Sequence, residues 1–259
     1  MGHWYDEFAN PRHFEGSGGR PTTLRDARRL EKQGDRIYPS VTTLLGTLAK
    51  PALTTWLQET ALLTSIDNPP RAAETHIEWA RRVIKIAREQ TMEKADAGTA
   101  IHDALELYFK GIETKAQLGI EFLPMCEAVD AALTAYCGRQ AWTPEESFVN
   151  ERIGYGGKCD LYSQDWVVDF KTKDTNADVA KARGWEEQAM QLAAYRHALL
   201  GPESEARMIN VFIPREWNDE SEVKIFEHTD PLAMDKFRAV TRLWSYQKKY
   251  GPYYERKYG

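Results

Sequence analysis

Residues 156–173 decide the fold, and they read Gly156-Gly-Lys-Cys-Asp-Leu-Tyr-Ser-Gln-Asp-Trp-Val-Val-Asp-Phe-Lys-Thr-Lys173. Two segments of this stretch, 158–163 and 166–172, carry apolar and aromatic residues at strand-like spacing, and the polar pair Gln164-Asp165 separates them. Short segments of this kind on either side of a two-residue turn predict a β-hairpin.

Two aspartates face each other in this hairpin if its turn is symmetric. The register then places Asp160 directly opposite Asp169, with the Cβ atoms about 4.5–5.5 Å apart, where like charges destabilise a sheet. A divalent cation removes this conflict because both carboxylates can coordinate it. Lys171 shares the face of Asp169 and could orient a water molecule there. The alternative is that both aspartates point to solvent, with Lys158 and Lys171 as their ion-pair partners.

Two helical patterns outside the hairpin add polar groups. Gly98, His102 and Glu106 recur at intervals of four residues and form one stripe, although a lone histidine is more often a core residue. Gln191 and Tyr195 share one face of a later helix, where such a pair more often caps the helix or lies at the edge of the core. His102 and Glu106 thus offer an imidazole and a carboxylate to one point, and Gln191 and Tyr195 offer an amide and a phenol on one helix face.

The order of expected elements predicts an α/β protein. Residues 1–39 read as a partly irregular extension with little core, residues 40–95 as a helical region, and residues 96–259 as the main domain with a C-terminal helix and a basic aromatic tail. Expected strands cover residues 148–153, 158–163, 166–172 and 208–214. Expected helices cover residues 40–49, 51–65, 72–93, 96–110, 123–138, 179–200 and 231–250.

Composition excludes several classes of protein. The 259 residues are 42% hydrophobic and 28% charged, which excludes wholesale disorder and a fibrous repeat. No apolar run approaches the roughly 18 residues that cross a bilayer, and the start has no signal-peptide pattern, so we expect a protein of the cytoplasm that is not secreted. Three scattered cysteines support no disulfide framework, zinc knuckle or iron–sulfur cluster.

The net charge of −5 argues against a uniformly basic nucleic-acid coat protein, but the charges are unevenly spread. Residues 20–36 hold six Lys or Arg and three acids, residues 236–259 hold seven and one, and residues 203–230 hold three and eight. Cations alternate with aromatic residues around Lys248 and Lys249, as they do on surfaces that follow a nucleic-acid strand. An amphipathic helix with a frayed polar tail is the other explanation.

The ordered motifs resemble those of the RecB-like branch of the PD-(D/E)XK nucleases, across residues 97–214. They are Gly98-Thr-Ala-Ile-His102, Gly156-Gly-Lys-Cys-Asp160, Val168-Asp-Phe-Lys171 and Gln191-Leu-Ala-Ala-Tyr195. Similar proteins include phage-encoded exonucleases of this branch and the mitochondrial genome maintenance exonuclease. The resemblance implies a restriction-endonuclease-like core, with a central mixed sheet flanked by helices, and a helical N-terminal extension.

The resemblance also implies Mg²⁺- or Mn²⁺-dependent hydrolysis of phosphodiester bonds. Asp160, Asp169, His102 and the Phe170 carbonyl would hold the metal, and Lys171 would position the attacking water. Four further residues would support the site or contact DNA: Gln191, Tyr195, Glu106 and Glu151. For Glu151 a salt bridge at the sheet edge is an equal alternative. A DNA-binding surface is expected from Arg81, Arg82, Lys85, Lys173, Lys248 and Lys249.

Three functions follow as hypotheses. The first is a DNA exonuclease that acts on single-stranded ends in replication, recombination or DNA processing, in a bacterial or phage-infected cell and with partner proteins of those processes. The second is a restriction-type or structure-specific endonuclease on the same fold. The third is a non-catalytic module that binds DNA or a partner protein. The sequence contains no GxxxxGK[ST] motif, so we expect no ATP, and the cysteines fit the subgroup without an iron–sulfur cluster.

Overall fold

The computed structural model describes residues 2–15, 19–111 and 119–258 and divides into two compact units. We call Met1–Thr47 with His102–Gly259 the core unit, and Leu48–Ile101 the hairpin unit. The expected boundaries at residues 39/40 and 95/96 differ from this division. The difference arises because the first 47 residues fold with the C-terminal part of the chain and not as a separate extension.

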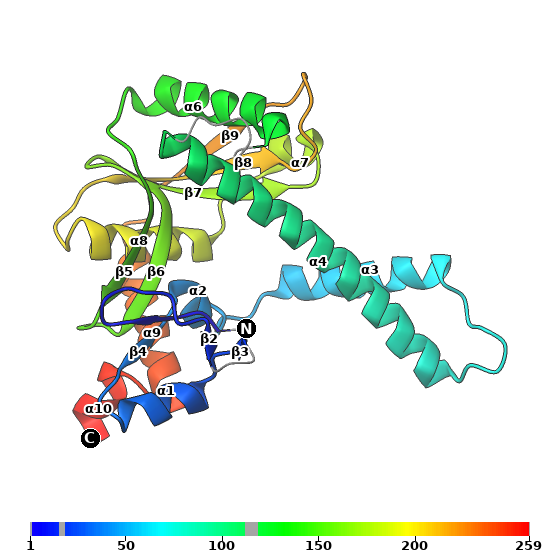
Figure 1. The fold of residues 1–259 in the computed structure, drawn as a ribbon, viewed down its shortest axis with the longest axis horizontal. Coiled ribbons are helices and arrows are strands. Elements are labelled where there is room, and N and C mark those ends of the chain that lie inside the picture. Colours follow the sequence, from blue (N-terminus) through cyan, green and yellow to red (C-terminus); the bar gives the residue numbers. More distant parts are fainter. Residues whose placement is uncertain (1, 16–18, 112–118, 259) are drawn as a thin grey trace. The chain divides into compact units, whose positions relative to one another are not determined.

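A five-stranded mixed sheet organises the core unit (Figure 1). Its strands lie in the order β5-β6-β7-β8-β9, and only the β7–β8 pair is parallel. The expected α/β class with a central mixed sheet and flanking helices is therefore confirmed at this level. The strand bounds are β5 Thr143–Asn150, β6 Tyr155–Tyr162, β7 Trp166–Lys173, β8 Arg207–Pro214 and β9 Lys224–His228.

The β6–β7 hairpin has the register expected from a symmetric turn. Leu161 pairs with Val168 and Tyr162 pairs with Val167. At the turn, the Ser163 amide donates a hydrogen bond to the Trp166 carbonyl at 2.8 Å. The next position on each strand is Asp160 and Asp169, so the two aspartates are neighbours across the hairpin.

Strand β6 starts earlier than expected because its glycines belong to the strand. A Cβ on Gly156 would lie 2.9 Å from the Tyr5 side chain, and one on Gly157 would lie 2.6 Å from the Phe148 ring. Aromatic rings therefore pack directly on the β6 backbone, and glycine is required for this approach. The sequence suggests a turn at these positions, but only Gly154, at φ +93°, lies outside the strand.

Two features of the sheet were not expected. Strand β5 begins at Thr143 and not at residue 148, which brings Glu145 into the sheet. Strand β9 adds an edge within the acidic segment of residues 203–230 and pairs antiparallel with β8, with Met208 opposite His228. Charged residues interrupt the β-branched pattern in both segments, which hides them from an analysis of hydrophobic periodicity.

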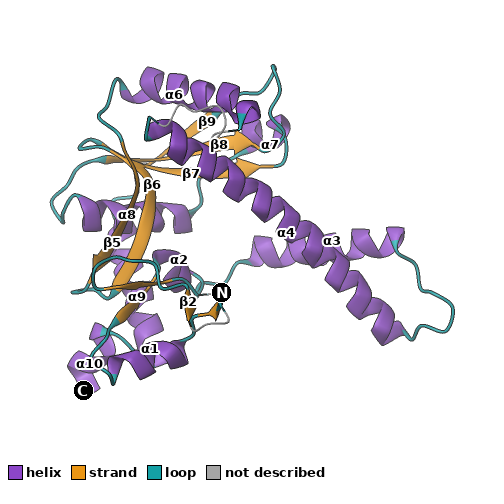
Figure 2. Ribbon diagram, in the orientation of Figure 1, coloured by secondary structure: helices purple, strands orange, loops and turns teal. Residues whose placement is uncertain are grey.

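Helices cover both faces of the sheet (Figure 2). The helix α8 (Glu186–Leu199) packs on the strands and on α9 (Ala233–Lys248), and α6 (Leu123–Cys137) lies on the other face. The single helix expected over residues 179–200 is instead α7 (Asn176–Lys181) followed by α8. The break contains Gly184, where a Cβ would lie 2.3 Å from the ring of His228 and 2.4 Å from that of Phe226.

The first 47 residues contribute to the hydrophobic core, contrary to the expectation of little core there. Strands β1 (Trp4–Asp6) and β4 (Ile37–Pro39) pair antiparallel, and β2 (Phe14–Glu15) pairs with β3 (Arg20–Pro21). Trp4 is 2% exposed, and its ring lies 5.9 Å from that of Tyr250. Tyr250 in turn donates a hydrogen bond to the Ile37 carbonyl at 2.7 Å.

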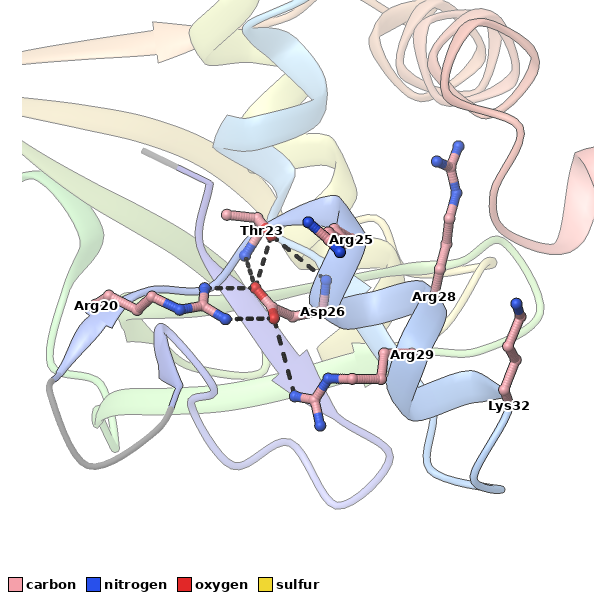
Figure 3. Close-up of a pocket in the computed structure, with 7 residues that line it drawn as sticks. All are labelled: Arg20, Thr23, Arg25, Asp26, Arg28, Arg29 and Lys32. Carbon is pink, nitrogen blue, oxygen red and sulfur yellow. Dashed lines mark hydrogen bonds and ion pairs between the residues drawn. The ribbon is translucent and has the colours of Figure 1, made fainter.

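Short helices complete the core unit. The helix α1 (Leu24–Glu31) starts with a capping box, in which Thr23 and Asp26 exchange hydrogen bonds (Figure 3). The helix expected over residues 40–49 is the shorter α2 (Val41–Leu45), and Ser40 caps it, because the Ser40 hydroxyl accepts from the Thr43 amide at 3.0 Å. The helix α10 (Pro252–Tyr258) follows α9, in place of the frayed polar tail that one of the two explanations expected. Ile120–Phe122 form the 3₁₀ turn η1.

The hairpin unit consists of α3 (Pro51–Asp67) and the first part of α4 (His76–Phe109). One continuous α4 replaces the two helices expected over residues 72–93 and 96–110, because neither Gly nor Pro interrupts residues 93–96. None of the helices in the described residues combines the length and apolar composition needed to span a membrane.

Candidate metal centre

Three carboxylates lie side by side across three strands. Glu145 on β5 stands opposite Asp160 on β6, because the neighbouring pairs are Pro144 with Leu161 and Glu146 with Cys159. Asp160 and Asp169 are the next residues beyond the paired Leu161 and Val168 of β6 and β7, and the charge of Asp160 acts on Asp169. Like charges in directly opposed positions destabilise a sheet, so this row of three requires compensation.

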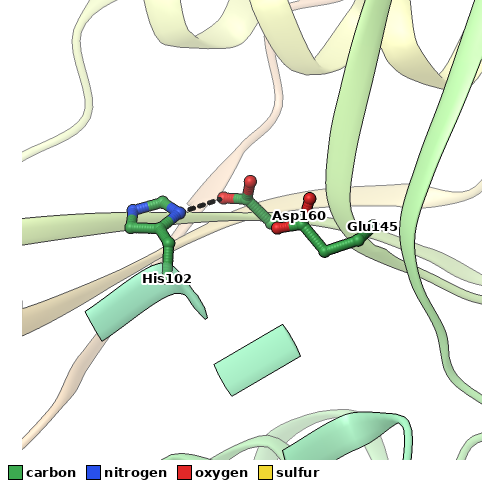
Figure 4. Close-up of side chains that lie close together, drawn as sticks. All are labelled: His102, Glu145 and Asp160. Atoms are coloured by element: carbon green, nitrogen blue, oxygen red, sulfur yellow. Dashed lines mark ion pairs between the residues drawn. The ribbon is translucent and has the colours of Figure 1, made fainter. Parts of the chain in front are cut away.

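His102 joins two of these carboxylates at one point (Figure 4). One ligand atom from each of His102, Glu145 and Asp160 lies within 4.8 Å of the others, and all three residues are half-buried. The ion pair between Nδ1 of His102 and Oδ2 of Asp160 spans 3.5 Å. This cluster could hold a metal ion.

The Asp160 carboxylate is held by a backbone amide as well as by the His102 imidazole. Its Oδ2 accepts a hydrogen bond from the Phe170 amide at 2.7 Å. Burial opposes ionisation of Asp160, but the hydrogen bond and charge of His102 outweigh it and hold the pKa of Asp160 below its usual value. Burial likewise opposes the charge of His102, and Asp160 raises the pKa of His102 against it. The pair therefore favours an ionised carboxylate in the site.

Asp169 is 3% exposed and receives three donors. Its Oδ1 accepts from Nε2 of Gln191 at 2.8 Å, and its Oδ2 accepts from Nδ2 of Asn210 and Nζ of Lys171, both at 2.6 Å. Burial raises the pKa of Asp169, whereas its charge and that of Asp160 raise the pKa of Lys171 despite burial. The alternative that Asp169 points to solvent is therefore wrong. Its other part, an ion pair between Asp169 and Lys171, is confirmed.

A second layer of buried polar groups fixes these donors. Gln191 also donates to the hydroxyl of Tyr195 at 2.8 Å, and both side chains are buried. Nε2 of His228 lies 2.7 Å from Oδ1 of Asn210. His228 was missed in the sequence because β9 was not expected, and Asn210 was missed although the strand over residues 208–214 was expected. A polar residue in the middle of the apolar run 208–214 was the available signal.

Glu145 is the carboxylate that sequence reasoning missed. Burial raises the pKa of Glu145 to about 7, even though it forms an ion pair with Lys158. Lys158 also lies 3.4 Å from Oε2 of Glu106, whose other oxygen pairs with Lys110. Glu106 therefore orients lysines beside the centre and is not among the clustered ligand atoms.

The structure brings together most of the expected residues but not all. Glu151 lies in the exposed turn after β5, six residues from Glu145, or about 20 Å along an extended strand. It is therefore remote from the centre. The Phe170 ring packs against that of His102, at 6.1 Å between centroids, while the metal-ligand role of its carbonyl stays a prediction.

The expected DNA-binding cations fall into separate regions. Arg81, Arg82 and Lys85 belong to the hairpin unit, where Arg82 is already paired with Glu74 at 2.8 Å. Lys173 ends β7, two residues beyond Lys171, and is half-buried. Lys248 and Lys249 are exposed at the end of α9.

The donor set fits a hard divalent cation. It consists of carboxylate oxygens and one imidazole nitrogen, and octahedral Mg²⁺ or Mn²⁺ prefers oxygen-rich sites of this kind. Positive charge placed among Glu145, Asp160 and Asp169 would remove their mutual repulsion. No protein-family model and no curated protein matches the chain.

Proposed function

We propose that this protein is a metal-dependent DNA exonuclease that hydrolyses phosphodiester bonds at single-stranded ends. One observation supports the proposal above the others: Asp160 and Asp169 are the next residues beyond the paired Leu161 and Val168 of the β6–β7 hairpin, and they form ion pairs with His102 and Lys171, respectively. The motif order of the PD-(D/E)XK resemblance contains the same four residues. Replication, recombination or DNA processing, with partner proteins of those processes, is the setting that the resemblance suggests.

Different residues of the centre would have different roles in the reaction. A bound Mg²⁺ or Mn²⁺ would lower the pKa of water and stabilise charge on the phosphate oxygens. His102, Glu145 and Asp160, whose ligand atoms cluster, would hold it together with Asp169. Carboxylate and imidazole donors of this kind suit Mg²⁺ or Mn²⁺. The Lys171 ammonium lies beside these carboxylates and orients a water or neutralises a developing negative charge. Gln191 and Asn210 fix the Asp169 carboxylate, so it need not reorganise during the reaction.

The test is cleavage of an end-labelled single-stranded oligonucleotide with and without Mg²⁺ or Mn²⁺. We expect cleavage only with metal, and a loss of at least about 100-fold in Asp169→Ala and in Lys171→Ala. Asp219→Ala and Lys181→Ala change the same residue types at exposed positions and should retain full activity. Thermal unfolding of each variant separates lost chemistry from lost folding. Metal-independent cleavage, or full activity in both site variants, contradicts the proposal.

Two further measurements separate the remaining hypotheses. Circular single-stranded DNA has no ends, so cleavage of circles identifies an endonuclease on the same fold. Calorimetric titration with Mn²⁺ tests the non-catalytic alternative, because binding DNA alone does not require adjacent carboxylates that repel phosphate. If no Mn²⁺ binds at millimolar concentration, the binding module replaces the exonuclease.

A further inference from the structure

A stripe of cations follows one side of α1. Arg25, Arg28, Arg29 and Lys32 occupy positions i, i+3, i+4 and i+7, which form a single line on a helix. All four are exposed. Like charges four residues apart destabilise a helix by a few tenths of a kcal/mol per pair, and this stripe contains two such pairs. The packing of α1 does not require them, because Ala27 and Leu30 provide its buried side.

The stripe borders a hollow of about 850 Å³ (Figure 3). Five cations line this hollow together with only one carboxylate, that of Asp26; the full lining is Arg20, Thr23, Arg25, Asp26, Arg28, Arg29 and Lys32. Its excess of positive charge predicts an anionic ligand.

Asp26 holds part of this lining in a fixed geometry. Its carboxylate is buried and accepts two hydrogen bonds from the Arg20 guanidinium, at 2.6 and 2.7 Å, while Arg29 lies 3.8 Å away. The hydrogen bond from Arg20 keeps the pKa of Asp26 well below its usual value. Asp26 therefore orders two arginines, and within the described part of the chain no carboxylate forms an ion pair with Arg25, Arg28 or Lys32.

The basic surface continues onto the end of α9. Arg28 donates a hydrogen bond to the Lys248 carbonyl, which brings the exposed Lys248 and Lys249 beside the stripe. The stripe itself is about 10 Å long from Arg25 to Lys32, a length over which one strand of a duplex presents about three phosphates. An elongated row of cations suits a polymer of phosphates better than a single small anion.

We propose that this surface, formed by the α1 stripe and the end of α9, binds the phosphate backbone of a nucleic-acid strand away from the metal centre. In Figure 1, α1 lies at the lower end of the core unit, whereas β7 and the part of α4 within this unit lie toward its upper end. The surface therefore holds a distant part of the strand that the metal centre cuts, and in this respect it rests on the proposed function. It contributes affinity only for strands long enough to reach it.

The test compares two double variants of equal charge change. Arg25→Glu with Lys32→Glu reverses two cations of the stripe, and Arg139→Glu with Lys181→Glu reverses two exposed cations elsewhere in the core unit. Affinity for a long labelled single strand is measured across a salt series with EDTA present, so that the strand is not cut. We expect the stripe variant to bind about 10-fold more weakly and its log–log salt slope to fall by about 1.4, which is about 0.7 for each lost phosphate contact.

Each other outcome is decisive. Equal loss in both variants, or an unchanged salt slope in the stripe variant, overturns the proposal in favour of a general charge effect. Tight binding of tripolyphosphate that depends on Arg25 and Lys32, with DNA affinity unchanged, assigns the hollow to a small anion instead. Arg25→Gln with Lys32→Gln, which keeps good helix formers in α1, guards against misfolding of the charge reversal and should lose affinity in the same direction.

A small chromogenic substrate separates this proposal from the proposed function. Bis-p-nitrophenyl phosphate is too short to reach α1, so the stripe variant should hydrolyse it with Mn²⁺ at the unaltered rate. If no variant hydrolyses either substrate but the stripe variant still loses DNA affinity, the catalytic proposal fails and the binding surface stands. If the stripe variant hydrolyses both the long strand and the short substrate at the wild-type rate, the surface has no role in holding the strand.

Discussion

Asn210 donates a hydrogen bond from Nδ2 to Oδ2 of Asp169 across 2.6 Å, and the same nitrogen lies 3.1 Å from the Asp169 carbonyl oxygen. The two residues face each other on the parallel strands β8 and β7, and Asn210 is fully buried. Because the amide nitrogen faces Asp169, the amide oxygen must accept from Nε2 of His228, at 2.7 Å. The Asp169 carboxylate is thus held by a chain of buried groups that begins on the edge strand.

Replacement of Asn210 by Ala should weaken Mn²⁺ binding without removing a ligand. The Asp169 carboxylate would lose a donor and some of its fixed orientation, and loss of such supporting hydrogen bonds commonly reduces metal affinity by about 10–100-fold. Calorimetric titration of the full chain with Mn²⁺ measures this. Asn218→Ala, at an exposed loop position, is the control. A folded Asn210→Ala protein with unchanged Mn²⁺ affinity would show that Asn210 has only a packing role.

Glu145 and Glu151 provide a matched pair, because they lie on or just after the same strand but only Glu145 belongs to the cluster. Glu145→Gln should weaken Mn²⁺ affinity by at least about 10-fold, equivalent to about 1.4 kcal/mol, since the amide is a poorer ligand for a hard cation. Glu151→Gln should have no effect. Equal affinities in the two variants would exclude Glu145 from the metal centre.

The hairpin could be predicted from sequence because residues close together in the chain determine it. Two apolar segments and a two-residue turn determine the β6–β7 register, and that register is enough to place Asp160 opposite Asp169. The partners Lys171 and Gln191 follow from strand and helix periodicity. Local pattern therefore predicted that these side chains are neighbours, whereas their role in a metal centre stays a prediction.

The residues that were missed depend on contacts that are distant in sequence. Glu145 enters the centre only because β5 extends five residues beyond the expected start of that strand, and the extension is stabilised by pairing with β6. Asn210 reaches Asp169 through a parallel pairing across 41 residues, which periodicity does not indicate. Glu151, the residue chosen instead, has the right charge at the wrong end of the strand.

The core unit should depend on its N-terminal segment. Trp4 is 2% exposed and contacts the rings of both Trp244 and Tyr250, so Trp4→Ala removes a large buried ring and leaves a cavity. We expect a loss of about 3–5 kcal/mol in the free energy of unfolding, measured by urea denaturation. Phe8→Ala, at a residue that is 77% exposed, should change it by less than about 0.5 kcal/mol. Similar small losses in both would mean that residues 1–47 are an independent extension.

His228 should make stability depend on pH. Burial lowers its pKa to about 4, whereas an unfolded chain binds a proton on histidine near pH 6.5. As the pH falls from 6.5 to 4, the unfolded state therefore binds more protons than the folded state, and the folded state loses about 1–3 kcal/mol from this residue. Glutamine in His228→Gln retains a donor for Asn210 but does not titrate. The free energy of unfolding of this variant should therefore fall less steeply as the pH is lowered from 6.5 to 4.

Urea denaturation of wild type and His228→Gln at several pH values between 4 and 7 measures the difference directly. Because other histidines titrate equally in both proteins, the difference between the two curves isolates His228. If the curves of wild type and His228→Gln are parallel, then His228 can take up a proton in the folded state. Its hydrogen bond to Asn210 would then not depend on a neutral, buried imidazole.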